Sequence, residues 1–404
     1  MKTIAVIAEY NPFHLGHQYL LTAIRQHVGN DASLAIIMSG AFVQRGEPAL
    51  FDKWTRAAWA LRHGADVVIE LPLVYAVSSA NGFASGAVRL AAKLGCDTIA
   101  CGVETGTAAA FRQLAQEATT IRDLPIQNHQ GQPYGQYVTE ALRQRCPDQQ
   151  ALLDSPNSLL ALEYTKAIVT YAPHMELLPI RRLGTTHDAP IVHRAFASAS
   201  ALRTHLRTLD IEAIKPYVPA DEYTDIVSLV QQGQMVSYDR YHDLVLYANR
   251  ITPPTVLQTY PAFTEGLENR WHRVYQQAPT WDEAMAALKT RRYSYSRLCR
   301  MGVYTTLRLP RTIVTASYTD GPQYARILAV APRGRALLKG SKKRIPIVTK
   351  VATDMKKLSP LRQEQFYYDC LGTDLQALSM QEPAYRQGRQ DYTHSPYIIS
   401  SCEI

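Results

Sequence analysis

The first half of the chain alternates short apolar runs with longer segments whose apolar residues recur at helical spacing. The runs are rich in β-branched residues, which favours buried strands over 3–8, 33–38, 67–72, 96–102 and 176–180. The intervening segments predict helices, among them 52–63 and 78–94, each with an apolar face. Strands that alternate with helices in this way predict an α/β fold with a parallel, doubly wound sheet.

The pattern changes after residue 207. From 211 to about 288 the apolar spacing is helical and is interrupted only by prolines, and 298–308 predicts one more helix. Short apolar runs at 326–330 and 345–348 predict two further strands. We therefore expect two domains, a sheet-containing domain over 1–207 and a mainly helical appendage over 208–404.

The first predicted strand is followed by a loop whose residues are suited to binding an anion. It opens into the string Glu9-Tyr10-Asn11-Pro12-Phe13-His14-Leu15-Gly16-His17, after which helical spacing begins. Unpaired N–H groups and the positive end of the helix dipole meet at such a point and favour an anion. Gly16 allows close approach of a ligand, and two histidines can donate to phosphate oxygens.

The HxGH string resembles the HIGH motif of the nucleotidyltransferase and class I aminoacyl-tRNA synthetase superfamily. The longer string from Glu9 to His14 resembles the bacterial tRNA(Met) cytidine acetate ligase family. Those enzymes activate acetate with ATP and acetylate the wobble cytidine of elongator tRNA(Met), which gives N4-acetylcytidine. The resemblance implies a Rossmann-like, ATP-binding nucleotidyltransferase domain in a cytoplasmic ligase. It implies Mg²⁺ that accompanies ATP, with no dedicated protein metal site.

Later segments extend the resemblance along the first 207 residues. The segment 39–56, SGAFVQRGEPALFDKWTR, implies that Arg45 contacts the triphosphate, while Lys53 is either a second contact or a solvated lysine. The segment 157–164, NSLLALEY, implies that Asn157 contacts adenosine, with a plain helix N-cap as the alternative. An ATP-contacting arginine is expected at Arg181 or Arg182, and the sequence does not choose between them.

The segment 198–203, SASALR, resembles the second motif of the superfamily. Its hydroxyls and helix-start amides hold the β- and γ-phosphates, and its arginine neutralises the leaving pyrophosphate. The resemblance therefore gives catalytic roles to His14, His17, Ser200 and Arg203. The ATP contacts that it implies are Ile7, Ala8, Glu9, Tyr10, Asn11, Pro12, Phe13, His14, Leu15, Gly16, His17, Gln18, Tyr19, Leu20, Arg45, Gly102, Asn157, Arg181 and Arg182.

The uneven distribution of charge indicates that the second half of the chain binds nucleic acid. The formal net charge is +8, but the segment from Trp281 to Lys357 holds seventeen Lys or Arg against four acids, a local balance of +13. A basic block of this size is typical of a nucleic-acid site, and we expect its loops, with Lys342, Lys343 and Arg344, to contact tRNA. Tyrosines interleave with these charges and are expected to stack on bases: Tyr293, Tyr295, Tyr304 and Tyr324.

Composition narrows the class of protein further. No run of about eighteen apolar residues is present, so a membrane span is not expected. Six cysteines lack CxxC pairs and are expected to be reduced and structural. Two other functions use the same residues: a nucleotidyltransferase that makes a dinucleotide-type cofactor, and a non-catalytic RNA-binding adaptor. The sequence does not distinguish acetate from a larger acid and does not identify a general base for cytidine N4.

Overall fold

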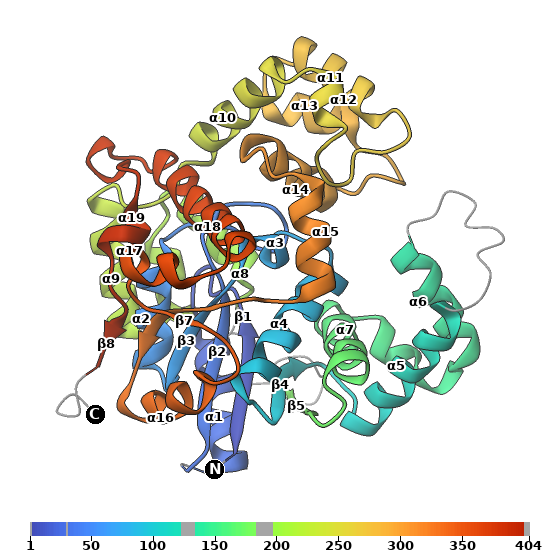
Figure 1. Ribbon diagram of the computed structural model, residues 1–404, viewed down its shortest axis with the longest axis vertical. Helices are drawn as coiled ribbons and strands as arrows, with labels where there is room; N and C mark the ends of the chain where they lie inside the picture. Colours follow the sequence, from blue (N-terminus) through green and yellow to red (C-terminus); the bar gives the residue numbers. More distant parts are fainter. Residues whose placement is uncertain (1, 30, 123–133, 183–196, 400–404) are drawn as a thin grey trace.

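A computed structural model describes residues 2–29, 31–122, 134–182 and 197–399. One mixed sheet occupies its centre, with strand order β5-β4-β1-β2-β3-β6-β7 and with β8 also paired to β6 (Figure 1). The strands are β1 (Thr3–Ala8), β2 (Ser33–Ser39), β3 (Val67–Leu71), β4 (Thr98–Val103), β5 (Glu176–Arg181), β6 (Ala325–Val330), β7 (Ile347–Val348) and β8 (Tyr397–Ile398).

Strands β1 to β5 pair in parallel, whereas β6 runs antiparallel to β3. Each of the five strands predicted in the first half is observed, with ends that shift by at most two residues. The α/β class with a mostly parallel, Rossmann-like sheet is therefore confirmed. The predicted strands near 326 and 345 are present as well, and they extend this same sheet.

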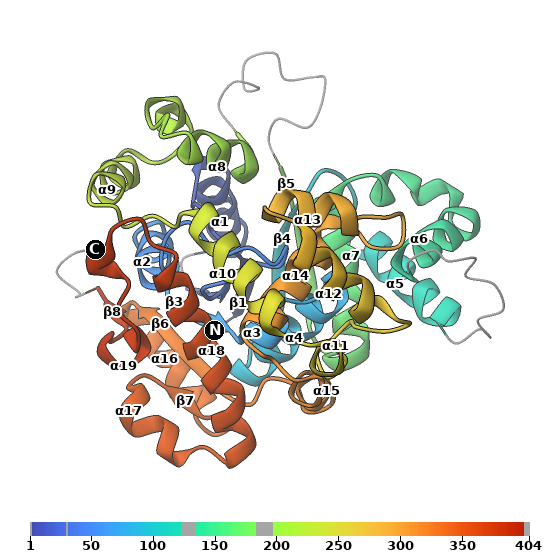
Figure 2. The same ribbon diagram turned by 90° about the horizontal axis from the view of Figure 1, so that it is seen from above.

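Helices surround the sheet on both faces (Figure 2). In chain order they are α1 (Leu15–Val28), α2 (Lys53–Arg62), α3 (Leu73–Ala76), α4 (Ala80–Leu94), α5 (Ala108–Arg122), α6 (Tyr134–Arg145), α7 (Pro156–Tyr171), α8 (Ala199–Arg207), α9 (Ala220–Gln231), α10 (Tyr238–Ile251), α11 (Pro254–Leu257), α12 (Leu267–Gln277), α13 (Trp281–Leu288), α14 (Tyr295–Thr306), α15 (Arg311–Asp320), α16 (Pro332–Ser341), α17 (Val351–Asp354), α18 (Pro360–Leu378) and α19 (Gln390–Thr393).

The alternation of side chains along each strand explains why helices cover both faces of the sheet. Along β1, Ile4 and Val6 pack in one buried cluster with α1, α2 and α8, while Ala5 belongs to the opposite cluster with α4, α5 and α7. Successive side chains of a strand point to opposite faces, so a strand that is apolar throughout is covered on both sides. The near-continuous apolar runs of the sequence follow from this arrangement.

The second half is mainly helical, and α10 to α14 stand above the carboxyl ends of the strands (Figure 1). Part of the basic block forms helix α16 between β6 and β7 rather than a loop, whereas Lys342, Lys343 and Arg344 lie in the turn that follows this helix, where a loop was expected. Buried Leu337 packs this helix into the main core. The division of the chain at residue 207 stays a prediction.

Candidate active site

The loop after β1 presents two histidines at the start of α1. His14 is the N-cap residue, and its Nδ1 accepts a hydrogen bond from the backbone N–H of Gly16 at 3.1 Å. The two imidazole rings stack with centroids 3.7 Å apart. A helix N-terminus with its first amides near a cleft favours a bound anion, as the sequence predicted.

Both imidazoles are held neutral. Burial and the guanidinium of Arg182 lower the pKa of His14 to about 4, and burial and His14 lower that of His17 well below its usual range. Because Nδ1 of His14 accepts from an N–H, its proton resides on Nε2. The ring therefore offers one N–H donor without a full charge.

Helix α8 carries the second motif to this loop. Ser198 caps the helix, accepting from the N–H of Ala201 at 3.2 Å. The Arg203 guanidinium donates to the backbone oxygen of Asn11 at 2.9 Å and to Oγ of Ser200 at 3.0 Å. Residues almost two hundred positions apart thus form one anion-binding corner, and α8 adds a second helix N-terminus to it.

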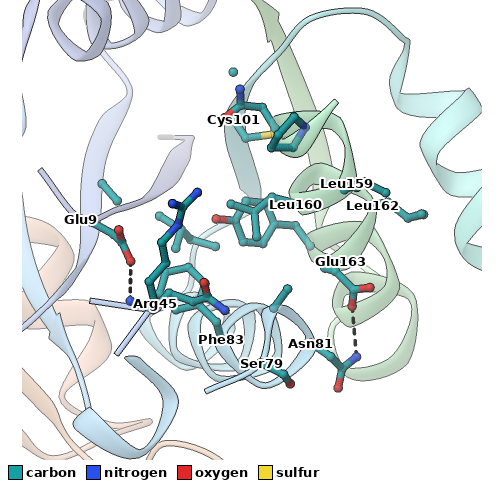
Figure 3. A pocket seen from close by; sticks show the side chains of 18 of the residues that line it. Glu9, Arg45, Ser79, Asn81, Phe83, Cys101, Leu159, Leu160, Leu162 and Glu163 are labelled. Atoms are coloured by element: carbon teal, nitrogen blue, oxygen red, sulfur yellow. Dashed lines mark hydrogen bonds between the residues drawn. The ribbon is translucent and has the colours of Figure 1, made fainter. Parts of the chain in front are cut away.

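The loop after β2 forms the next wall. Its Gln44 N–H donates to Oε1 of Glu9 at 2.7 Å, and burial raises the pKa of that carboxyl. Arg45 follows, exposed at the cleft (Figure 3). Behind them Arg56 is fully buried and donates to the carbonyls of Glu9, Ser39, Gly40 and Phe51. Arg56 ends the family-like segment 39–56, but the sequence indicated no role for it, because its partners are backbone oxygens that only the fold brings to it.

Residues at the carboxyl ends of strands β4 and β5 form the other side of the cleft. A Cβ built at Gly102 would lie 3.1 Å from Cγ of Arg182, so this glycine makes room for the arginine rather than for a ligand alone. Arg182 also lowers the pKa of both histidines, which places its guanidinium near them. Both Arg181 and Arg182 line the cleft, and an ATP contact by one of them stays a prediction.

Asn157 lies in the first turn of α7 and is not its N-cap. Ser155 occupies the cap position, and Nδ2 of Asn157 donates to Oε1 of Glu104 at 2.5 Å. Glu104 also accepts from Oγ of Ser155 at 2.6 Å, and these hydrogen bonds lower the pKa of its carboxyl. The alternative of a plain cap was wrong, and Glu104, which orients Asn157, was missed because it belongs to no motif.

Lys53 differs from both sequence interpretations. It is fully buried, with its Nζ 2.8 Å from a carboxylate oxygen of Glu70 and 2.8 Å from Oδ1 of Asp391. Lys53 is therefore neither solvated nor available to a triphosphate. Two carboxylates hold it inside the protein, and one of them comes from the last helix of the chain.

Three of the four tyrosines expected to stack on bases are buried. Tyr293, Tyr304 and Tyr324 belong to the core, whereas Tyr295 is 42% exposed. Tyr304 and Tyr324 use their hydroxyls inside the fold, donating to the oxygen of Val77 and to Asp369. Their interleaving with basic residues reflects amphipathic packing rather than a row of stacking surfaces.

One cleft of about 1660 Å³ brings most of the predicted site together. Its lining includes His14, His17, Ser200 and Arg203, together with Arg45, Gly102, Asn157 and both candidate arginines. The loop residues that also line it are Ile7, Ala8, Glu9, Tyr10, Asn11, Gly16, Tyr19 and Leu20. Pro12, Phe13, Leu15 and Gln18 do not line it, and Phe13 is buried in the core.

The described residues contain no group of three or more His, Cys, Asp or Glu side chains that could hold a metal ion. The five described cysteines are free and buried, and Cys402 lies outside the described residues. None of the described helices is both long and apolar enough to cross a membrane. Neutral histidines, arginines and helix N-termini line one part of the cleft, and such groups are suited to a polyphosphate.

Comparison with known proteins agrees with this chemistry. A model of the HIGH Nucleotidyl Transferase family matches residues 1–391. A tRNA(Met) cytidine acetate ligase of Latilactobacillus sakei is 38% identical over 363 residues, covering 88% of this chain and 89% of that protein. One from Geobacillus sp. is 34% identical over 389 residues, covering 90% and 92%.

A solved structure also resembles this chain over nearly its whole length. The crystal structure of Thermotoga maritima TmcAL bound with alpha-thio ATP superposes with a TM-score of 0.89 at 29% identity, covering 99% of this chain and 100% of that one. The family match spans nearly the whole chain and the two ligases exceed 30% identity. The chain therefore belongs to the tRNA(Met) cytidine acetate ligase family of HIGH nucleotidyl transferases.

Proposed function

We propose that this protein activates acetate with ATP and transfers the acetyl group to N4 of the wobble cytidine of elongator tRNA(Met). The observation that carries the proposal is the corner where the neutral His14–His17 pair meets Ser200 and Arg203. The relatives' names and the ATP analogue in the Thermotoga structure support it. The proposal includes a cytoplasmic location, where ATP, acetate and tRNA are available together.

The first step forms acetyl-adenylate. An acetate oxygen attacks the α-phosphorus of ATP, an O–P bond forms, and the bond to pyrophosphate breaks. The histidine N–H donors face the charge that develops on the α-phosphate oxygens, and they need no reorganisation because packing fixes both rings. Arg203 and the start of α8 hold the leaving pyrophosphate. Mg²⁺ that accompanies ATP would supply further charge neutralisation, and no dedicated protein ligands are proposed for it.

The second step uses the amine of cytidine. N4 attacks the acetyl carbonyl, a C–N bond forms, the C–O bond to AMP breaks, and N4 loses a proton. Pyrophosphate release from ATP, measured with a panel of small carboxylates and with or without tRNA, tests the proposal. Acetate should support release and acetyl should appear on tRNA. Release that depends on a nucleotide-type phosphate instead would favour a cofactor-forming enzyme, and no release at all would favour an RNA-binding adaptor.

Arg203→Ala should raise the KM for ATP and slow adenylate formation more than transfer from supplied acetyl-adenylate. The reason is that Arg203 both faces the leaving group and holds the Asn11 carbonyl at 2.9 Å. Separate assays of the two half-reactions check this expectation. Arg207→Ala, one turn later in α8 and outside the cleft lining, is the matched control. Equal losses in both half-reactions would contradict the assignment of Arg203 to the leaving group.

The tRNA surface lies close to α14 in this proposal. Ser294 and Ser296 line the cleft, and the basic residues just before them, Lys289, Arg291 and Arg292, are exposed. Lys342 and Lys343 follow α16, where Oγ of Ser341 donates to the oxygen of Leu94 at 2.7 Å. Leu94 ends the helix that leads into the amino end of β4, so this second cluster lies at the amino ends of the strands, whereas His14 follows the carboxyl end of β1.

Charge reversal distinguishes the two clusters. Changing Lys289, Arg291 and Arg292 to Glu should weaken tRNA binding and flatten its salt dependence, since each lost phosphate contact removes about 0.7–0.9 from the slope of log K against log salt. Changing Lys339, Lys342 and Lys343 to Glu makes the same change in charge and should leave the slope near that of the wild type. Titration of each variant with tRNA at several salt concentrations distinguishes the two clusters. If the Lys339, Lys342 and Lys343 variant lost more affinity and more slope, the tRNA site would instead lie at α16.

A further inference from the structure

The cleft is larger than its nucleotide half requires. Pockets for small ligands measure about 300–1,000 Å³, whereas this one measures about 1660 Å³. The predicted ATP contacts gather near the carboxyl ends of β1, β4 and β5 and the start of α8. The remaining walls come from α4, α5, α6 and α7, with Ser294 and Ser296 at the start of α14. Acetate is too small to fill this part, so a second substrate of nucleobase size has room there.

Two polar side chains meet on the wall that α4 and α7 form in this part of the cleft (Figure 3). Nδ2 of Asn81, in the first turn of α4, donates to Oε2 of Glu163 on α7 at 3.2 Å. Lys166 donates to the other oxygen, Oε1, at 2.7 Å. The Glu163 side chain is 20% exposed. Each carboxylate oxygen accepts about two hydrogen bonds, so Glu163 retains acceptor capacity toward the cleft.

Apolar side chains flank this pair. Phe83 on α4 and Leu160 on α7 both line the cleft, and Figure 3 shows them on the walls between Glu9 and the Asn81–Glu163 pair. A flat heterocycle is well accommodated by apolar side chains along its faces and polar groups at its edge.

We propose that this α4–α7 wall is the cytosine subsite, with the Glu163 carboxylate accepting a hydrogen bond from the exocyclic amino group of the target base. The inference rests on the proposed function. It adds the side chain that selects cytidine as the base that receives the acetyl group. A carboxylate accepts from cytosine N4 but repels the O4 oxygen that uracil carries at the same place. Asn81 and Lys166 act as positioning residues, because they fix both oxygens of Glu163.

The position along α7 suits this role. Glu163 follows Asn157 by six residues, which is about 9 Å along a helix. The predicted adenosine contact and the predicted base contact therefore occupy successive stretches of one rigid element. A base held at Glu163 would lie beside the nucleotide rather than in its place, within the same cleft as the histidine pair.

Binding of two tRNA(Met) transcripts, one with cytidine and one with uridine at the wobble position, tests the subsite without requiring turnover. The wild type should prefer cytidine by about 5- to 150-fold, the value of one specific base contact. Glu163→Gln should lose most of this preference, because its amide can rotate to donate to uracil O4. Glu176→Gln, an exposed glutamate at the amino end of β5 and outside the cleft lining, should keep it.

Asn81→Ala provides a second variant in case Glu163→Gln folds poorly, and it should lower the preference by a smaller factor. An unchanged cytidine preference in both variants would overturn the subsite. Acetate-dependent exchange between ATP and pyrophosphate, measured on the same wild-type preparation, reports on the proposed function independently. If the wild type showed no such exchange while Glu163→Gln still reduced the preference for cytidine, the ligase chemistry would be rejected and the subsite would be kept.

Discussion

His14→Ala and His17→Ala should each lower acetate-dependent exchange between ATP and pyrophosphate by about 10²–10³-fold, the effect of removing one preorganised donor to a developing oxyanion. The stacked rings lie at the start of α1, and burial keeps both neutral, so each contributes an N–H donor without desolvating a cation. Initial exchange rates at saturating acetate measure the effect.

Matched variants separate catalysis from folding. His14→Asn keeps a good N-cap side chain on α1 and should fold like the wild type while remaining slow. His27→Ala, exposed in the last turn of the same helix, should exchange at the normal rate. Since burial lowers the pKa of His14 to about 4, exchange should show no inflection near the ordinary histidine pKa of about 6.5. Near-normal exchange in both alanine variants would contradict the assignment of this loop.

The sheet was predictable because its signals are local. The run from Thr3 to Ala8 carries its own β-branched pattern and ends at a loop, and the structure places β1 over those same residues. Helix α16 was missed for a related reason. Its Arg, Gly and Lys residues read as a loop, but buried Leu337 and Ser341 anchor it against the sheet and against Leu94.

The site was predictable only as far as its motifs extend. The HxGH and SASALR strings identified residues that the structure brings into one cleft. Glu104 and Arg56 escaped notice because a lone glutamate after a strand and a lone arginine in a helix are common at the surface. Their importance comes from partners fixed by the fold, Asn157 and a set of backbone carbonyls. Contacts of this kind have no sequence spacing to recognise.

Lys53→Met should reduce the free energy of unfolding by about 3–5 kcal/mol, the usual effect of breaking a buried ion pair by removing one partner. Lys53 is fully buried between Glu70 and Asp391, so its loss leaves the Glu70 carboxylate buried without its salt-bridge partner and leaves Asp391 with the more distant Arg326, at 3.9 Å. Urea denaturation measures the change. Lys343→Met removes an exposed lysine of the same size and should stay within about 0.5 kcal/mol of the wild type.

The pH dependence of this deficit tests its cause. Burial raises the pKa of the Glu70 carboxyl, and Lys53 opposes that rise. Without the lysine the folded-state pKa increases further, so the folded variant binds a proton that the unfolded chain releases. Such a group costs nothing below its unfolded pKa, and its cost grows as the pH rises toward the folded pKa. The deficit should therefore be smaller near pH 5 than near pH 8, and one that does not change with pH would mean that lost packing, not uncompensated charge, destabilises the variant.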